Sequence, residues 1–449
     1  MQRDITTTLV EWKERPGRKP LIIRGARQTG KSYSVNAFGK EYFNGNIHSI
    51  NFERRPDYST IFELNYEISR IISELEILVN KRIIPGEDLL FFDEIQTCPK
   101  AIVSLRYFYE QLPELHVIAA GSLLEFALKD ISFPVGRVQL LNMNPMTFRE
   151  FLIARDKSLA AEVISGGTKA LSESVHTMLN DELKKYFFVG GMPECVKLYT
   201  ETNSMQAVIE IQSDLINTFR QDFSKYAGRS DKSCLNAVLT SLSQKVGQQV
   251  KYSSLAEGFT NPTIKKAFEL LETARLITRV SAASPAGMPL GASSSEKKFK
   301  AIMLDIGLLT NLSGISHATE FIKNDLLAIF RGALAEQFTG QEIRAATGAA
   351  LYYWSREARN SNAETDYLIE KQGKIIPIEV KSGKSGSLKS LHLLLDTFQN
   401  IETAYVFSNA PYGNDPGQKI TFLPLYFAGT SVKSSTRFNT GNETADGIA

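Results

Sequence analysis

The stretch "PLIIRGARQTGKSYSV" (residues 20–35) reads as a strand, a loop and the beginning of a helix. Residues 21–23 form a short apolar run, which is typical of a buried parallel strand. From Gly25 to Ser32 the chain matches the spacing G-x-x-x-x-G-K-S. In this spacing the glycines let the backbone bend so that its N–H groups point inward at phosphate groups. The stretch therefore predicts a phosphate-binding loop in an α/β fold with a parallel sheet.

The residues of this loop have separate predicted tasks. Lys31 can reach the β- and γ-phosphates of ATP, and the hydroxyl of Ser32 can take one coordination position of Mg²⁺. The helix that follows directs the positive end of its dipole at the same phosphates. The residues expected to bind the nucleotide are Gly25, Ala26, Arg27, Gln28, Thr29, Gly30, Lys31 and Ser32.

A second signal lies in "DLLFFDEIQ" (residues 88–96), an apolar run that ends in Asp93 and Glu94. A hydrophobic strand that delivers an acid at its C-terminal end, downstream of such a loop, is the expected Walker B arrangement. We expect Asp93 to hold Mg²⁺ together with Ser32, and Glu94 to polarise the attacking water. The other interpretation of Glu94 is that it caps the next helix.

Two further residues complete the predicted site. The run "LHVIAAGS" (residues 115–122) predicts a third strand, and Ser122 at its end is either a polar sensor beside the γ-phosphate or the N-cap of the next helix. Arg137 is a candidate for the cation that neutralises charge on the transferred phosphoryl group, in its own subunit or a neighbouring one. Its other interpretation is a solvated or ion-paired surface residue. The predicted catalytic set is Lys31, Glu94 and Arg137.

The order and spacing of four segments resemble a known family. These segments are "KPLIIRGARQTGKSY", "FFDEIQ", "AAGSLL" and "GRVQLLNMNPMTFREF". They resemble the prokaryotic AAA-type (AAA_14-like) ATP-binding proteins that carry a C-terminal DUF4143 domain, and the likeness extends over residues 1 to about 430. The resemblance implies an AAA+/STAND-like P-loop NTPase core at residues 1–150 and a DUF4143 domain at residues 301–428.

The middle of the chain predicts two more regions. Residues 151–230 are helical in composition and are expected to form a lid over the ATP site. In their turn "VGGMPE", the pair Gly190 and Gly191 and the following Pro193 have a backbone-geometry role. Residues 231–300 predict a winged helix, whose wing would be two strands on either side of a Gly-, Pro- and Ser-rich loop. This module either contacts DNA or only packs between the two flanking domains. The basic residues available for a DNA contact are Lys265, Lys266, Arg275, Lys297, Lys298 and Lys300.

The C-terminal signal is "ETDYLIEKQGKIIPIEVKSG" (residues 364–383). Glu379 and Lys381 lie two apart in a strand pattern and therefore share a face, and a hairpin can bring Asp366 beside them. With Glu336 on the preceding helix, this is the constellation of the PD-(D/E)xK nuclease-like α/β fold, in which DUF4143 domains are generally placed. Such a centre would hold a second divalent metal and support phosphodiester hydrolysis, although activity is a separate question from fold. Upstream, Asp305 is expected to cap a helix.

Composition bears on the possible partners and on the cellular compartment of the protein. The 449 residues are 43% hydrophobic and 22% charged, with a formal net charge of +2, which neither favours nor excludes a nucleic-acid partner. The three cysteines are widely separated, so they offer no zinc framework and suit a reducing compartment. No signal peptide and no membrane-length apolar run is recognised, so we expect a cytoplasmic protein with no membrane partner. Residues 429–449 are polar and are expected to be disordered.

These features predict an ATP-binding protein, a Mg²⁺-dependent P-loop ATPase that couples its nucleotide state to a nuclease-like C-terminal domain. Two alternatives stay open. One is a DNA nuclease that uses a divalent metal and is gated by ATP. The other is a non-catalytic module that ATP switches and that binds DNA or a protein. The expected cofactors are ATP and Mg²⁺, and a homo-oligomer is a candidate assembly.

Overall fold

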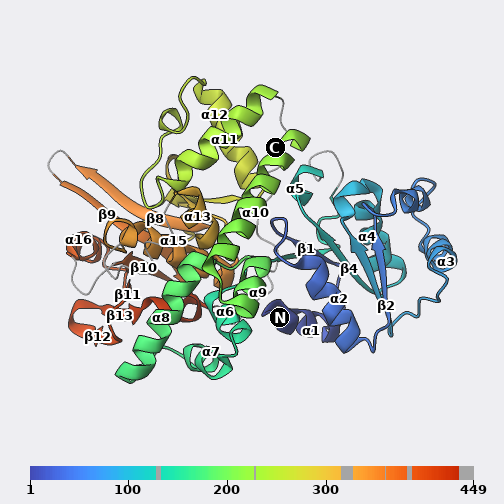
Figure 1. Cartoon of the computed structure of the whole chain (residues 1–449), viewed down its shortest axis with the longest axis horizontal. Helices are drawn as coiled ribbons and strands as arrows, with labels where there is room; N and C mark the ends of the chain where they lie inside the picture. Colours follow the sequence, from blue (N-terminus) through green and yellow to red (C-terminus); the bar gives the residue numbers. More distant parts are fainter. Residues whose placement is uncertain (128–132, 227–228, 315–326, 359–360, 382–386, 434–449) are drawn as a thin grey trace. The chain divides into compact units, whose positions relative to one another are not determined.

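A computed structural model describes residues 1–127, 133–226, 229–314, 327–358, 361–381 and 387–433 (Figure 1). The chain divides into two compact units, an N-terminal unit of residues 2–144 and a C-terminal unit that begins at residue 145. None of the described helices combines the length and the apolar character that crossing a membrane requires.

The N-terminal unit is built on a parallel sheet with the strand order β2-β3-β4-β1-β5 (Figure 1). This is the parallel α/β core that the sequence predicts for a P-loop NTPase. The central strand β1 pairs with β4 on one side and with β5 on the other. The strands are β1 (Leu21–Arg24), β2 (Ile47–Asn51), β3 (Leu89–Asp93), β4 (His116–Gly121) and β5 (Gln139–Asn142). The helices are α1 (Ile5–Glu14), α2 (Lys31–Tyr42), α3 (Ile68–Val79), α4 (Pro99–Gln111) and α5 (Leu124–Ala127).

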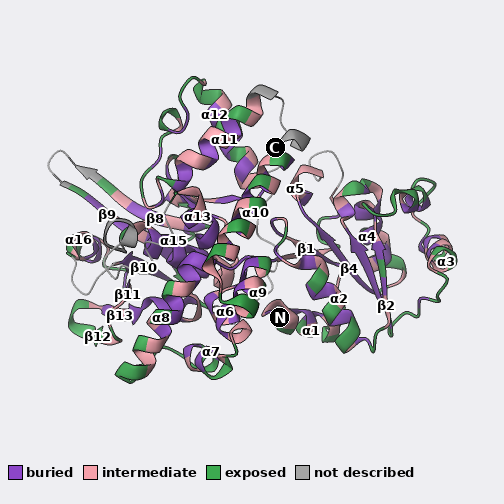
Figure 2. Cartoon of the chain, viewed as in Figure 1, coloured by how far each residue is buried: buried purple, intermediate pink, exposed green. Residues whose placement is uncertain are grey.

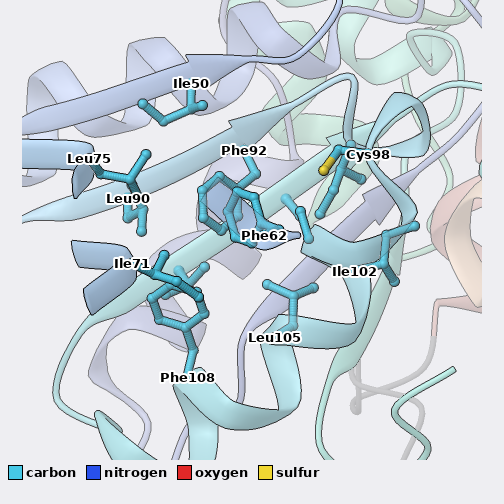
Figure 3. Close-up of a cluster of buried hydrophobic side chains, with 14 of the residues drawn as sticks. Ile50, Phe62, Ile71, Leu75, Leu90, Phe92, Cys98, Ile102, Leu105 and Phe108 are labelled. Atoms are coloured by element: carbon cyan, nitrogen blue, oxygen red, sulfur yellow. The ribbon is translucent and has the colours of Figure 1, made fainter. Parts of the chain in front are cut away.

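Both faces of this sheet are buried, which explains why its inner strands are continuous apolar runs. Alternate residues of β3 enter different clusters: Leu90 and Phe92 face one side, and Leu89 and Phe91 face the other. The side of Phe92 is covered by α3 and α4, whose apolar side chains pack against it in Figure 3. There Phe92 meets Phe62 and Phe108 edge to face, each with ring centres 5.8 Å apart. The buried colouring of the inner strands β1, β3 and β4 in Figure 2 follows from this two-sided cover. The residues labelled in Figure 3 are Ile50, Phe62, Ile71, Leu75, Leu90, Phe92, Cys98, Ile102, Leu105 and Phe108.

The first part of the C-terminal unit is helical, as the sequence predicts. Its first helix begins with a capping box, in which Thr147 and Glu150 bond each other's backbone N–H groups. The helices are α6 (Phe148–Ala154), α7 (Ser158–Ser165), α8 (Glu173–Val189), α9 (Pro193–Thr202), α10 (Met205–Tyr226), α11 (Arg229–Ser243) and α12 (Asn261–Thr273).

The Gly-Gly turn after α8 packs directly on Asp305. Gly190 has φ 71° and ψ −167°, a conformation that is essentially restricted to glycine. A Cβ atom at Gly190 would lie 2.2 Å from Oδ1 of Asp305, and the N–H of Gly191 donates to Oδ2 at 2.6 Å. Asp305 also accepts from the N–H of Leu308 and so caps α13 (Ile306–Leu312). The predicted backbone role of these glycines and the capping role of Asp305 are confirmed.

The second part of the C-terminal unit is a mixed sheet of eight strands in the order β12-β13-β11-β10-β9-β8-β6-β7. The strands are β6 (Ile277–Ala282), β7 (Ser295–Met303), β8 (Leu351–Ala358), β9 (Ser361–Lys371), β10 (Lys374–Val380), β11 (Ala404–Ser408), β12 (Gly413–Asp415) and β13 (Ile420–Pro424). The helices that accompany it are α13, α15 (Leu327–Thr347), α16 (Lys389–Thr397) and α17 (Ala428–Val432).

Three predictions about this region need correction. The strands expected to be the wing of a winged helix, β6 and β7, pair with each other, but β6 also pairs with β8, so both belong to the eight-stranded sheet. The predicted domain boundary at residue 300 falls inside β7. The tail predicted to begin at Gly429 also begins too early, because α17 continues to Val432. Residues 434–449 lie outside the described residues.

Candidate functional site

The loop between β1 and α2 has the tight curvature that its sequence predicts. Gly30, at the N-terminus of α2, has φ 92°, and Gln28 is also left-handed with φ 62°. Gly25 is required for a different reason: a Cβ atom there would lie 2.3 Å from the carbonyl oxygen of Met143, just beyond β5. The loop therefore approaches the neighbouring backbone so closely that only glycine fits at its first position.

The lysine of the loop is folded back onto the loop itself. Lys31 is buried, and its Nζ donates to the carbonyl oxygens of Gly25 at 3.0 Å and Ala26 at 2.7 Å. The Thr29 hydroxyl donates to the Ala26 carbonyl at 3.0 Å. These contacts place the ammonium group at the centre of the loop, where the sequence predicts that it meets phosphates.

Ser32 and Asp93, the two predicted magnesium ligands, are brought together. The Ser32 hydroxyl donates to Oδ1 of Asp93 at 2.7 Å, and the amide of Asn51 donates to Oδ2 at 2.9 Å. Burial raises the pKa of Asp93, and the hydrogen bonds from Ser32 and Asn51 act in the opposite direction. Asn51 was not predicted. Its signal was available, since a polar residue ends β2 in register with Asp93 on β3.

Glu94 lies just after β3 in a left-handed conformation, with φ 51°. Its Oε2 accepts from the amide of Gln96 at 2.6 Å and from the hydroxyl of Ser122 at 3.3 Å. The side chain does not cap the short helix that follows, which removes the alternative interpretation. Ser122 thus lies beside the predicted catalytic acid. Gln96 was not predicted, and a Cβ atom at Gly121 would lie 2.4 Å from its Oε1.

Arg137 lies on the surface of the N-terminal unit. Its Nε donates to Oε1 of Glu110 at 2.9 Å, and its side chain is about half exposed. Hydrogen bonds from Arg137 and Arg106 lower the pKa of Glu110. The structure therefore places Arg137 in the ion-paired setting that was one of its two interpretations, and the role as a catalytic cation stays a prediction.

A buried arginine near the start of the chain holds the phosphate-binding loop through hydrogen bonds to backbone carbonyls. Arg3 donates to the carbonyl oxygen of Thr29 at 2.8 Å and to that of Asn144 at 2.8 Å. It therefore joins the phosphate-binding loop to the chain beyond β5. No motif marks this residue in the sequence, because its partners are backbone carbonyls that lie far along the chain.

In the C-terminal unit, the predicted acids do gather on neighbouring elements. Asp366 on β9 and Glu379 on β10 lie on paired antiparallel strands, and Oδ2 of Asp366 accepts from the N–H of Val380 at 2.7 Å. The Nζ of Lys381 lies 2.5 Å from Oε1 of Glu379. Burial raises the pKa of Glu379 to about 7. Glu336, on α15, is also buried.

An unpredicted cation lies among these acids. Lys300 on β7 has a side chain that is 1% exposed, and its Nζ lies 2.9 Å from Oε1 of Glu336, 2.5 Å from Oε1 of Glu364 and 3.6 Å from Oδ1 of Asp366. Burial lowers the pKa of Lys300, but the three carboxylates outweigh this effect and raise it, so the side chain stays charged. The prediction that Lys300 contacts DNA is therefore wrong, because its ammonium is enclosed by protein.

Two of the other residues predicted to contact DNA form ion pairs on the protein surface. Lys265 pairs with Glu269 at 3.6 Å, and Lys266 pairs with Asp231 at 3.1 Å. Both lysine side chains are more than half exposed, so these pairs are weak. Arg275, Lys297 and Lys298 remain predicted contacts, and nothing in the fold tests them.

The geometry of the N-terminal unit defines a class of protein. A parallel sheet, a G-x-x-x-x-G-K-S loop between β1 and α2, and an acid at the end of β3 that bonds the loop serine are the features of a P-loop NTPase. Comparison with protein families gives the particular architecture: an AAA domain matches residues 17–152, and the domain of unknown function DUF4143 matches residues 331–427. The chain thus combines an N-terminal AAA domain with a C-terminal DUF4143 domain. Between the two, a domain of unknown function, DUF8612, matches residues 180–319.

Individual relatives are distant. An uncharacterized protein of Haemophilus influenzae is 23% identical over 274 residues, which is 57% of this chain and 60% of that protein. A Walker-type ATPase of Pyrococcus abyssi is 16% identical with a TM-score of 0.44, covering 69% of this chain and 95% of its own. AMPPCP-bound DnaA of Aquifex aeolicus is 16% identical with a TM-score of 0.27, covering 59% and 74%.

Proposed function

We propose that the N-terminal unit binds ATP together with Mg²⁺ and hydrolyses it. The observation that carries this proposal is the direct hydrogen bond between Ser32 of the loop and Asp93 of β3, with Lys31 at the centre of the loop beside them. Loop, lysine, serine and acid are the complete set of protein groups that nucleotide binding in this class requires.

The residues present fit a magnesium ion. The hydroxyl of Ser32 and the carboxylate of Asp93 are oxygen donors, which hard divalent cations prefer, and they lie 2.7 Å apart. When bound, Mg²⁺ would neutralise charge on the β- and γ-phosphates. Lys31 would leave the carbonyls of Gly25 and Ala26 and donate to phosphate oxygens, while the loop N–H groups hold the rest of the triphosphate.

For hydrolysis, Glu94 is the proposed general base. Its carboxylate is held by Gln96 and Ser122, so it has a defined position at the end of the sheet from which to accept a proton from water. Arg137, from this subunit or from a neighbouring copy, stays the proposed cation for the transition state. We further propose that the nucleotide state repositions the C-terminal half of the chain, as in switch-type NTPases.

The test of nucleotide binding is Lys31→Ala. We expect this variant to lose ATP binding, because it lacks the ammonium group that is predicted to contact the β- and γ-phosphates. The measurement is a titration with a fluorescent ATP analogue in the presence of Mg²⁺. Lys40→Ala, at the exposed end of the same helix, is the matched control and should titrate like the unmodified protein. An unchanged titration curve for Lys31→Ala would overturn the proposal.

The non-catalytic alternative is distinguished by turnover. Tight ATP binding with no measurable phosphate release from the unmodified protein would favour a module that ATP merely switches. A salt-dependent shift of DNA in a gel would then identify nucleic acid as its partner.

A further inference from the structure

The C-terminal acidic centre is organised around a lysine. Lys300 comes from β7, Glu336 from α15, and both Glu364 and Asp366 from β9, so elements distant in the sequence converge on its ammonium group. The two Nζ–oxygen distances below 3 Å are those of charge-assisted hydrogen bonds. A cation of the protein's own is therefore already the shared partner of three carboxylates.

The ammonium group is also enclosed on its other sides. The ring of Tyr353 lies with its centre 5.2 Å from Nζ, within the range of a cation–π contact. The loop at Gly247 covers Glu336, because a Cβ atom there would lie 2.6 Å from Oε2 of that residue. Gln337, next to Glu336 on α15, bonds both backbone groups of Met303 on β7. The position of Lys300 is thus fixed by packing and by backbone hydrogen bonds together.

Several carboxylate oxygens of this centre are already bonded to protein groups. Asp366 has Oδ2 bonded to the N–H of Val380, and its Oδ1 faces Lys300. Glu379 has Oε1 bonded to Lys381, and among the described residues no hydrogen-bond partner reaches its buried Oε2. A divalent cation requires several oxygen ligands, and a fixed ammonium group at their focus repels it. The donor set as arranged does not fit a divalent metal.

We propose that Lys300 is a built-in counter-ion that takes the place of the divalent metal in the nuclease-like centre. The DUF4143 domain then holds no metal at Glu336, Asp366 and Glu379, and it cannot perform metal-assisted phosphodiester hydrolysis there. The acids have a structural task instead, which is to fix β7 against α15 and β9. This inference is independent of the proposed ATPase activity.

The experiment measures Mn²⁺ binding by electron paramagnetic resonance in the absence of nucleotide. All proteins carry Asp93→Asn, which removes a predicted metal ligand of the N-terminal unit. With Lys300 in place we expect no Mn²⁺ bound at the C-terminal centre. Lys300→Met should gain a Mn²⁺ site, and adding Asp366→Asn should remove it. Lys297→Met, an exposed lysine on the same strand, is the matched control and should gain none.

Two outcomes would overturn the proposal. One is a Mn²⁺ ion bound while Lys300 is present and lost on Asp366→Asn or Glu379→Gln. The other is a folded Lys300→Met protein that still binds no Mn²⁺, because the ammonium group would then not be what excludes the ion. If Lys300→Met does not fold, Lys300→Gln replaces it. Cleavage of DNA by the unmodified protein with Mg²⁺ or Mn²⁺, lost on Asp366→Ala, would also contradict the proposal, whatever the variants do.

Discussion

At the scale of single residues, the nucleotide site combines side chains that belong to recognisable sequence motifs with side chains that belong to none. Lys31, Ser32 and Asp93 could be predicted because each occupies a fixed place in a short pattern. Asn51 and Gln96 could not, because they act by contacting Asp93 and Glu94 across the end of the sheet. Such contacts depend on strand order, which a sequence pattern does not contain.

Glu94 gives the first prediction at this scale. Glu94→Gln keeps the shape of the side chain but removes the base, so we expect ATP binding to persist while hydrolysis falls by about 100-fold or more. Phosphate release under saturating ATP and Mg²⁺ is the measurement. Glu87→Gln, an exposed acid just before β3, serves as the control and should hydrolyse ATP normally. Normal hydrolysis by Glu94→Gln would show that another group is the base, without affecting the proposal that ATP binds.

At the scale of helices and strands, predictions succeeded where burial determines the pattern. The apolar runs of β1, β3 and β4 are buried on both faces of a parallel sheet. Such a run can be recognised as a buried strand from its own residues, without knowledge of its partner strands. The strands β6 and β7 were also recognised as strands. Their membership in the eight-stranded sheet was not, because β6 pairs with β8 far along the chain, and periodicity does not identify a partner.

One strand of the N-terminal sheet carries a pH-dependent contribution to stability. His116 on β4 is buried, with its ring edge to face with Phe43 at 4.9 Å and with Trp12 at 6.0 Å. Burial, aided by repulsion from Arg18 and Lys13, lowers its pKa from 6.5 to about 4. The unfolded chain therefore takes up a proton at His116 more readily than the folded chain does. The contribution of neutral His116 to the free energy of unfolding is thus fully present above pH 6.5 and is lost as the pH falls toward 4.

We expect His116→Phe to reduce this loss, since a phenyl ring fills the aromatic cluster but does not titrate. Urea unfolding between pH 7.5 and pH 4.5, followed by Trp12 fluorescence in a Trp354→Phe background, measures the difference. If both proteins lose stability equally over this range, the burial of His116 is not the cause.

At the scale of the whole molecule, the sequence predicts the AAA domain at the N-terminal end and the DUF4143 domain at the C-terminal end. The residues between these two domains are divided differently in the prediction and in the structure. Five segments were expected, whereas the described residues form two compact units. The helices after residue 145 and the eight-stranded sheet share one unit, partly through the Gly190–Asp305 packing. The acids of the C-terminal centre were predictable from spacing, but Lys300 was not, because it reaches them from a strand assigned to another domain.

The Gly190 turn allows the two units to be tested separately. Gly190→Ala forces a side chain into a glycine-only conformation and against Asp305, and we expect it to lower the free energy of unfolding of the C-terminal unit by about 2 kcal/mol or more. Thermal unfolding measures this change. Gly17→Ala is the control: Gly17 also has a positive φ, of 66°, but the added methyl group there meets open space, so the difference between the two variants reports the clash with Asp305. ATP titration of the same protein reports on the N-terminal unit and should be unchanged. A Gly190→Ala protein as stable as Gly17→Ala would contradict the argument.

The buried lysine of β7 also constrains the order in which the C-terminal unit can assemble. While the chain is unfolded, Lys300 and its three acids are hydrated separately. Removing either side from water before the other arrives is costly, because a buried charge without its partner is strongly destabilising. We therefore expect strand β7, helix α15 and strand β9 to dock in one concerted step. A nascent chain interrupted before β9 would then lack two of the three carboxylates that pair with Lys300.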